Sequence, residues 1–464
     1  MKQREKSYSI DMCTGVIWKK MLRFALPLMC SGVLQLLFNA ADIVVVGRFA
    51  GDNSLAAVGS NASLINLLTN LFIGLSVGAN VVAAKCFGSR DEQNLSRTVH
   101  TAMLLSLVSG ALLAVVGAVG ARQILIWMRS PENVLSLATL YLRIYFLGMP
   151  ATMIYNFGSA LLRSIGDTKR PLHYLFLAGV VNVALNLFFV ISLRMDVAGV
   201  ALATVLSQAI SAGLILRCLI RETGGIHLEL RQLRFHKTCF RQILQVGLPA
   251  GMQGILFAIS NVVIQSSVNS FGEVIMAGNS AAANIEGFVY LSMNAFYQAA
   301  ISFTSQNMGA GLHKRVYRIL GASQFFSIAT GVLLGTLAWV FGHPLLSLYS
   351  TSPAVIEAGM ARLGIVSRTY ALCGVMDTMV GILRGIGYSV MPMIVSLMGS
   401  CVLRLVWIAT IFQIPRFHTI EVVYISYPIT WVVTLSIHLL CFIWAMRRVE
   451  RRAAEPPAAL EDEE

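Results

Sequence analysis

Charged side chains are scarce in this sequence. Asp, Glu, Lys and Arg make up 12% of the 464 residues, where soluble domains carry about 25%, and 56% of the residues are hydrophobic. Such a chain cannot cover a water-facing surface of this size, so most of it must lie in lipid. The hydrophobic residues form blocks of about 20 or more, which is the length a helix needs to cross a bilayer, and they lack the alternation of membrane strands.

Several signatures of catalysis are also missing. The sequence has no nucleotide-binding loop, metal-ligand cluster or nucleophile with a paired base, so we expect no enzyme, no catalytic residue and no cofactor. None of the eight cysteines falls in a predicted outer loop, which excludes a structural disulfide. The first apolar stretch has no small-residue cleavage pattern and is expected to be a retained helix.

Acidic residues are outnumbered, with 22 Asp and Glu against 35 Lys and Arg, for a net charge of +13. A nucleic-acid partner would explain this excess, but so would the tendency of membrane proteins to collect Lys and Arg in cytoplasmic loops. With the N-terminus inside, 25 of the 35 basic residues fall in cytoplasmic segments and five in outer loops. This distribution predicts no nucleic-acid partner, a cytoplasmic-membrane location, two cytoplasmic termini and an even number of spans.

The second half of the chain repeats the first at an offset of 221 or 222 residues. Leu26-Pro27 aligns with Leu248-Pro249, and Leu162-Arg163-Ser164-Ile165-Gly166 aligns with Leu383-Arg384-Gly385-Ile386-Gly387. An even number of spans per repeat gives both halves the same orientation, with a cleft between them. The sequence therefore predicts an all-α polytopic membrane protein with twelve transmembrane helices in two homologous six-helix lobes around a central cleft. The expected spans are 23–47, 54–84, 98–120, 134–162, 171–193, 197–219, 242–268, 275–305, 315–341, 354–383, 391–412 and 420–446.

The predicted N-lobe covers residues 1–220 and the predicted C-lobe residues 242–447. A basic cytoplasmic linker at 221–241 joins them and either sets the topology or contacts anionic lipid, and a disordered tail follows at 448–464. Pro150 and Pro428 lie inside spans, where each produces a fixed kink or acts as a hinge. We expect a monomer whose partners are the lipid bilayer and small organic substrates.

Only three of the carboxylates map well inside a span: Asp42, Glu286 and Asp377. Ionisable groups in hydrocarbon cost several kcal/mol, so each is a candidate functional residue. Asp42 lies about 9 Å below the outer end of its helix, and Asn186 and Thr204 lie about 12 Å deep in theirs, with Asn182 one turn below Asn186. Carboxylate, amide and hydroxyl oxygens suit a hard cation or a proton, although Asn and Thr also pack helices together by hydrogen bonding.

The motifs around these residues resemble the multidrug and toxic compound extrusion (MATE) family. They are Asp42 with Val46-Gly47-Arg48, the pair Asn182 and Asn186, the run from Gly199 to Thr204 with Ser207-Gln208, and the duplicated Leu-Arg-x-Ile-Gly. The resemblance extends from about Trp18 to Arg447. It implies antiport, in which sodium or proton entry drives export of amphipathic, often cationic compounds. It also implies that Asp42, Asn182, Asn186 and Thr204 form the coupling site.

The second half departs from the family pattern. Many members carry an acid shortly after the second Leu-Pro, whereas Gly251 to Asn261 has none here, which puts a cation site on the seventh expected span, 242–268, in doubt. Glu286 and Asp377 could instead recognise substrate, or one of them could neutralise the buried Arg404. Large, soft side chains also mark the expected cleft helices and either bind ligand or pack the core. The candidates are Met252, Phe257, Phe288, Tyr290, Met293 and Tyr297.

The leading hypothesis is a secondary active exporter, coupled to sodium in preference to protons because three neutral oxygen ligands serve a metal cation better than a proton relay. The same neutral groups could instead tune the acidity of Asp42 for a proton-driven cycle. A flippase for a lipid-linked sugar or precursor has a similar architecture but needs fixed cationic groups for pyrophosphate. A channel or receptor would need neither duplicated lobes nor a buried ion site.

Overall fold

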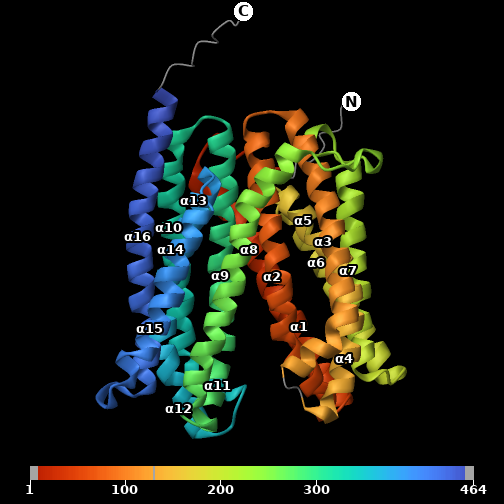
Figure 1. The fold of residues 1–464 in the computed structure, drawn as a ribbon, viewed down its shortest axis with the longest axis vertical. Helices are drawn as coiled ribbons and strands as arrows, with labels where there is room; N and C mark the ends of the chain where they lie inside the picture. Colours follow the sequence, from red (N-terminus) through yellow and green to blue (C-terminus); the bar gives the residue numbers. More distant parts are fainter. Residues whose placement is uncertain (1–8, 129–130, 455–464) are drawn as a thin grey trace, which may run out of the picture.

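Long helices run side by side through the molecule (Figure 1). The computed structural model describes residues 9–128 and 131–454. The first half contains α1 (Ile17–Phe49), α2 (Asp52–Gly88), α3 (Glu92–Trp127), α4 (Glu132–Leu147), α5 (Met149–Ser164), α6 (Lys169–Leu187), η1 (Phe188–Ser192) and α7 (Asp196–Arg221). The linker contains η2 (Gly224–Ile226) and η3 (Leu230–Gln232). The second half contains α8 (Lys237–Asn269), α9 (Glu273–Gly309), α10 (His313–Val340), α11 (Gly342–Ser347), α12 (Pro353–Arg362), η4 (Leu363–Ser367), α13 (Ala371–Ile386), α14 (Val390–Ser396), η5 (Leu397–Val402), α15 (Leu403–Ala409), η6 (Ile411–Gln413), η7 (Pro415–Phe417) and α16 (Ile420–Ala454).

Within the described residues, nine helices are long and apolar enough to cross a membrane, and the pair α4 and α5, bent by 47°, makes up to ten. Pro150 stands just after this bend. The helix α9, which carries the buried Glu286, and the run from α12 to α13, whose two helices have 10 and 16 residues, complete twelve rods. The predicted all-α fold with twelve helices in two six-helix lobes is therefore confirmed.

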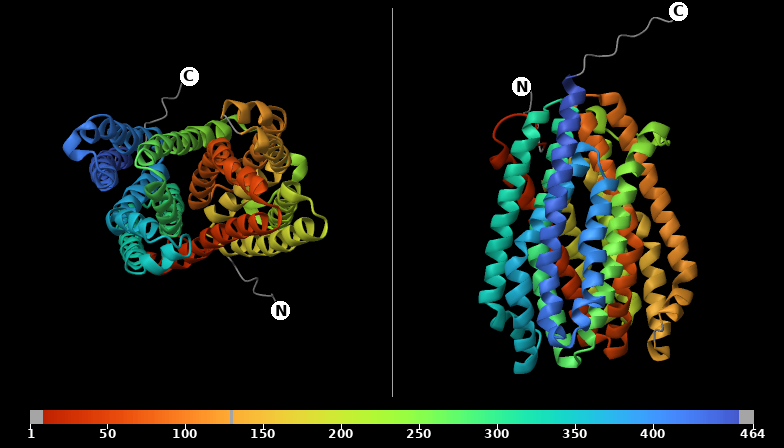
Figure 2. Two further views of the ribbon diagram at one scale, coloured as in Figure 1. Left: turned by 90° about the horizontal axis from the view of Figure 1, so that it is seen from below. Right: turned by 60° about the vertical axis from the view of Figure 1, so that its left-hand side comes forward.

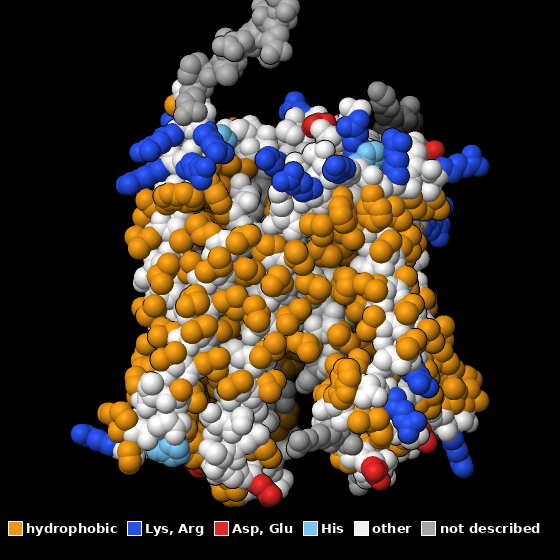
Figure 3. All heavy atoms as spheres, in the orientation of Figure 1, with side chains coloured by type: hydrophobic (Ala, Val, Ile, Leu, Met, Phe, Trp, Pro, Cys, Tyr) orange, Lys and Arg blue, Asp and Glu red, His pale blue; other side chains and the backbone are white. Residues whose placement is uncertain are grey.

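The two lobes meet at one end of the molecule and separate at the other. Viewed along the helices, the first and second halves of the chain form two groups side by side (Figure 2). A hollow opens between them at the end away from the termini, and Lys and Arg side chains gather at the opposite end (Figure 3). We call these the open end and the basic end. The first residue of α1 and the last residue of α16 both lie at the basic end (Figure 1).

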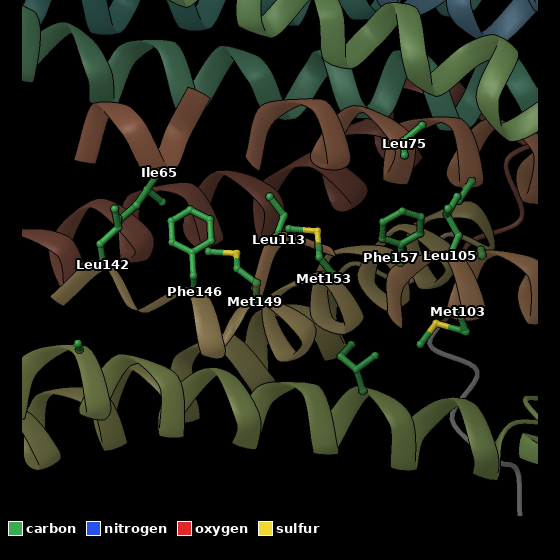
Figure 4. Packing of buried hydrophobic residues seen from close by; sticks show 14 of the residues in the cluster. Ile65, Leu75, Met103, Leu105, Leu113, Leu142, Phe146, Met149, Met153 and Phe157 are labelled. Carbon is green, nitrogen blue, oxygen red and sulfur yellow. The ribbon is translucent and has the colours of Figure 1, made fainter. Parts of the chain in front are cut away.

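Each lobe has its own hydrophobic core. In the N-lobe, large side chains from α2, α3, α4 and α5 interlock, with Phe146, Met149, Met153 and Phe157 fully buried (Figure 4). Such packing makes the six helices of a lobe move as one body, because close-packed interiors resist deformation.

The helix α1 divides its packing between the lobes. Its first half lies against the C-lobe, where Phe24 meets Phe303 edge to face at 5.7 Å and joins a cluster with α9, α10 and α13. Its second half lies against α6 of the N-lobe, where Phe38 packs over Gly179. The repeat-related α8 packs along α2 in the same manner, so α1 and α8 run along opposite edges of the seam (Figure 2).

Glycines allow the lobes to touch through their backbones at the basic end. A Cβ on Gly88 would lie 2.0 Å from the carbonyl oxygen of Gln306, and a Cβ on Gly309 would lie 2.0 Å from that of Lys85. These two contacts are related by the sequence repeat, which places its axis between α2 and α9. Gly78 makes a similar approach to α8.

The residues before α1 close the seam at the basic end. We call residues 9–16 the strap. Met12 is fully buried; its N–H donates to Oε1 of Gln306 at 3.3 Å, and its carbonyl accepts from Nδ2 of Asn307 at 3.1 Å. Gln306 in turn donates from Nε2 to the carbonyl oxygen of Ser164 at 2.6 Å, so one C-lobe side chain holds both the strap and the N-lobe.

The linker packs on the N-lobe. The N–H groups of Glu229 and His236 donate to His100 and Thr101 of α3, both at 3.1 Å. The predicted disordered tail is wrong for its first residues, because α16 continues to Ala454 and its arginines extend the helix. Residues 455–464 of that tail lie outside the described residues.

Candidate functional site

The four oxygen-bearing residues predicted to meet in the N-lobe do meet. Nδ2 of Asn186 on α6 donates to Oδ1 of Asp42 on α1 and also to Oδ1 of Asn182, the latter at 3.2 Å. Nδ2 of Asn182 donates to the hydroxyl of Thr204 on α7 at 3.4 Å. A chain of hydrogen bonds therefore joins α1, α6 and α7 beneath the open end, and it involves Asp42 on the half of α1 that belongs to the N-lobe.

One acceptor in this cluster is left over. Asn186 is fully buried, and its Oδ1 has no hydrogen-bond partner among the described residues. A buried unpaired oxygen costs about 1–3 kcal/mol, so its retention calls for a missing partner. Together with the Asp42 carboxylate and the Thr204 hydroxyl, this oxygen forms a set of hard ligands that suits a small cation. No described group of three or more His, Cys, Asp or Glu side chains could hold a metal ion, so the site offers only oxygen ligands from one acid and its neutral neighbours.

Two tyrosines of α4 belong to this site and were not predicted. Tyr141 and Tyr145 stack with ring centroids 5.9 Å apart, and both lie within electrostatic range of Asp42. A period of one helical turn on α4 was the available signal, but nothing in the sequence showed that α4 would bring these rings near Asp42.

In the C-lobe, Glu286 pairs with Arg362 and not with Arg404. The guanidinium of Arg362 donates from Nη2 to Oε2 of Glu286 at 2.7 Å and from Nε to both carboxylate oxygens at 3.1 and 3.2 Å. Its Nη1 donates to Asn279 at 2.7 Å. Both charges are buried, so this network ties α9 to α12 and leaves Glu286 no free oxygen with which to attract a ligand.

Arg404 and Asp377 lie apart in the same lobe. Arg404 is buried, donates from Nη2 to the Thr430 hydroxyl at 2.8 Å and stacks over Tyr427 at 4.0 Å. Its Nε has no partner, and no salt bridge to it occurs among the described residues. Asp377 instead interacts with the hydroxyl of Tyr290 and with Arg384. The expected neutralisation of Arg404 by one of the two acids therefore does not occur.

Arg384 was assigned to a cytoplasmic segment from the sequence but is buried inside α13. Its Nη2 donates to Oε1 of Gln253 on α8 at 2.8 Å, and its Nη1 donates to the Tyr297 hydroxyl. The arginine of the duplicated motif is thus a strut between C-lobe helices.

The candidate cleft residues divide by exposure. Met252 is 42% exposed, Phe257, Phe288 and Tyr290 are half-buried, and Met293 and Tyr297 are buried. The sulfur of Met293 packs against Gly331 and Gly374 inside the C-lobe. Only the first four therefore present surface that a ligand could contact in this conformation.

A model of the MatE family matches the chain twice, over residues 27–188 and 249–410. The chain belongs to the MatE family. It is 27% identical over 449 residues to "Probable multidrug resistance protein YoeA" of Bacillus subtilis, which covers 94% of this chain and 96% of that one. It is 24% identical over 393 residues to "Probable multidrug resistance protein NorM" of Thermotoga maritima, covering 84% of each.

The fold also matches a solved MATE structure over nearly its whole length. The structure described as the outward-facing conformation of a multidrug resistance MATE family transporter of the MOP superfamily superposes with a TM-score of 0.88, at 22% identity, covering 96% of this chain and 98% of that one. As a member of the MatE family this protein is a membrane transporter and not an enzyme.

The two MatE matches, whose ends are offset by 222 residues, confirm the duplication. At the offset of 221 or 222 residues, Asp42 aligns with Val263 or Ile264, Asn182 with Leu403 or Arg404, and Asn186 with Trp407 or Ile408. The C-lobe therefore has no acid at the corresponding place, and the guanidinium of Arg404 lies at or next to the position that corresponds to Asn182. The contact between the helices is retained, because Asn182 reaches Thr204 in one lobe and Arg404 reaches Thr430 in the other.

Local helix geometry distinguishes these polar positions. A π-helix begins directly after Arg362, another begins two residues after Asn186, and a third ends two residues before Arg404. Single π-helical turns occur frequently at functional sites because they reorient nearby side chains. The sequence carries no signal for them that propensities could detect.

Proposed function

We propose that this MatE-family transporter exports small amphipathic organic compounds, including drugs, in exchange for sodium that binds at Asp42, Asn182, Asn186 and Thr204. The unpaired Oδ1 of Asn186 beside the Asp42 carboxylate carries the proposal, because a cation is the partner that this arrangement needs. The names of the Bacillus and Thermotoga relatives support multidrug export. One chain supplies both lobes, so a monomer suffices, and the substrate site lies in the hollow between them.

The proposed orientation places the basic end in the cytoplasm, as the Lys and Arg distribution favours. The hollow at the open end then faces the outside, and the molecule is in an outward-open state. Sodium enters from that side. Because α1 carries Asp42 on its N-lobe half and packs on the C-lobe with its other half, a cation at Asp42 acts on a helix that both lobes share.

The flippase alternative requires fixed positive charges facing the hollow. Arg362, Arg384 and Arg404 are instead held inside the C-lobe by Glu286, by Tyr297 with Gln253, and by Thr430 with Tyr427. The antiporter is therefore the better supported function. Extrusion of a fluorescent organic cation that ignores imposed sodium and proton gradients would favour the alternative.

The test of the proposal is sodium-dependent stability of the purified protein at constant ionic strength. A ligand that binds only the folded state stabilises it by mass action, by about 2.7 kcal/mol at one hundred times its Kd. We expect sodium to raise the midpoint of thermal unfolding above that in potassium, no sodium effect in Asp42→Asn, and a weaker one in Asn186→Ala.

The matched control is Asp196→Asn. Asp196 is exposed, precedes Thr204 on the same helix and has a left-handed backbone, which Asn also accepts. This variant should keep the full sodium effect. If stability responds to pH through Asp42 and shows no preference for sodium over potassium, coupling is to protons.

A further inference from the structure

The two lobes differ at the end of the duplicated motif. In the N-lobe the strap packs against this place, whereas the corresponding place in the C-lobe is open. Gly166 and Gly387 end the duplicated motif with positive φ angles of 90° and 116°. At Gly166, the backbone of Ile10 in the strap packs so closely that a Cβ would lie 2.4 Å from its carbonyl oxygen. At Gly387, nothing lies within 4 Å of the same position. The strap has no counterpart here, because the linker packs on α3 instead.

A groove with a volume of about 860 Å³ lies at this opening, between the first turns of α8 and α14 at the basic end. Its walls are apolar, and three wall residues, Leu248, Val390 and Ile394, are 41 to 50% exposed. Such exposed apolar walls are expected to face lipid in a membrane-spanning chain. The groove is therefore not a site for a free, water-soluble ligand.

The polarity of the groove changes along its length. Arg241 lies at its mouth, one turn inside α8, and Leu248 lies seven residues deeper, which is about 10 Å along the helix. Arg241 is exposed and makes no salt bridge within the described residues. A cationic mouth above apolar walls is complementary to a phospholipid, because the anionic phosphate would meet the cation and the acyl chains would meet the apolar walls.

A second hollow beside the groove adds positive charge. Its volume is about 530 Å³, and Arg447, Arg448 and Arg451 of α16 line it. Aromatic side chains connect the groove to this hollow. The ring centroids of Tyr388, in the groove, and Trp444 lie 5.5 Å apart, and the guanidinium of Arg448 lies 5.4 Å from the centroid of the Trp444 ring. Neither is lined by an Asp or a Glu. Amphipathic rings beside basic groups are typical of the headgroup level of a membrane.

We infer that this groove binds one anionic phospholipid of the leaflet at the basic end, with its phosphate on Arg241 and an acyl chain against Leu248, Val390 and Ile394. The lipid completes beside Gly387 the wall that Ile10 completes beside Gly166. Basic pockets between transmembrane helices are known as sites for acidic headgroups, and each basic side chain near an anionic surface contributes roughly fivefold in affinity. The inference is independent of the exported compound and of the coupling cation.

The test is native mass spectrometry with phosphatidylglycerol and phosphatidylcholine of matched acyl chains. The wild-type protein should retain one phosphatidylglycerol with an affinity at least fivefold higher than for phosphatidylcholine. Arg241→Ala should remove most of this preference, and Ile394→Trp, which fills the groove, should weaken both lipids. The matched control is Arg231→Ala, because Arg231 is exposed on the linker and lines neither hollow.

Equal retention of the two lipids, or equal effects of Arg241→Ala and Arg231→Ala, would overturn the inference. If inorganic phosphate bound the protein as tightly as phosphatidylglycerol does, the inference would also be overturned, since the acyl chain would then contribute nothing. A second measurement leaves the groove unaltered. In a chain whose other five tryptophans are replaced by Phe, brominated phosphatidylglycerol should quench Trp444 more strongly than brominated phosphatidylcholine.

Discussion

The two lobes differ in the polar groups that they place between corresponding helices. The N-lobe has an acid and an unpaired acceptor at Asp42 and Asn186, whereas the C-lobe has a buried guanidinium with an unpaired donor at Arg404. A cation can enter the first arrangement and is repelled by the second. If sodium couples transport, each molecule should therefore bind one sodium in its N-lobe and none at the corresponding place in its C-lobe.

Sodium binding to the purified protein measures this number directly. We expect one radioactive sodium ion per chain by equilibrium dialysis and less than 0.1 per chain in Asp42→Asn, on the order of a tenfold loss for removal of the only charged ligand. Arg404→Lys keeps the positive charge and should still bind one. A second sodium that survives Asp42→Asn would show that the C-lobe has its own site.

The buried pair Glu286 and Arg362 should respond to mutation in a non-additive way. Removing one partner strands a buried charge, so Glu286→Gln and Arg362→Met should each cost about 3–5 kcal/mol of unfolding free energy, whereas the double variant should lose much less. Unfolding in a denaturing detergent measures all three. Simple additivity would show that the two side chains do not stabilise each other.

Sequence patterns located Asp42, Asn182, Asn186 and Thr204 but not the partners in the C-lobe. The depth of each residue in the membrane could be inferred from its distance to the charged residue at the end of its helix. These depths placed the four side chains at about the same level. The partner of Glu286 depended on the rotation of α12 about its axis, which the π-helical turn after Arg362 changes. No hydropathy pattern reports that rotation.

At the scale of whole elements, lengths and order were predictable and tertiary roles were not. The expected spans correspond to the twelve rods, and the break between α4 and α5 falls next to Pro150. The strap was not anticipated, since residues 9–16 carry no hydrophobic period and gain their order only from Gln306, Asn307 and Gly166 on distant helices.

Adding a single methyl group at Gly166 should displace the strap from its contact with the end of α5. Gly166→Ala places a Cβ against Ile10, whereas Gly387→Ala places one in open space at a similar positive φ, so the second variant controls for backbone strain. Burial raises the pKa of the Cys13 thiol in the strap, which keeps it protonated and slow to react. We expect Gly166→Ala to increase maleimide labelling of Cys13 several-fold, in a variant without the other seven cysteines, and Gly387→Ala to leave it unchanged.

For the whole molecule, the basic end must open if the protein transports by alternating access. The seam there is closed by backbone contacts at Gly78, Gly88 and Gly309, and a side chain at any of them would wedge the lobes apart. A molecule wedged in this way should lose the outward-open state even when sodium is present.

Gly78→Val tests this expectation, with Gly213→Val as the control because Gly213 faces open space within α7. Spin labels at Ser89 and Ala310, on opposite sides of the seam, report the separation of the lobes. We expect Gly78→Val to lengthen that distance by several ångströms and to reduce export at least tenfold, whereas Gly213→Val should resemble the wild type. An unchanged distance in Gly78→Val would show that the seam tolerates a side chain.

The divided packing of α1 also constrains how the protein is made. This helix is synthesised before the other helices described here, yet the partners of its first half lie on α9 and α10, and the partner of Met12, Gln306, follows 294 residues later. At roughly 5–20 residues per second, synthesis of that interval takes on the order of 15–60 s. The growing chain therefore holds a half-covered helix in the membrane for most of its translation, and the N-lobe reaches its final structure only after the C-lobe has been inserted.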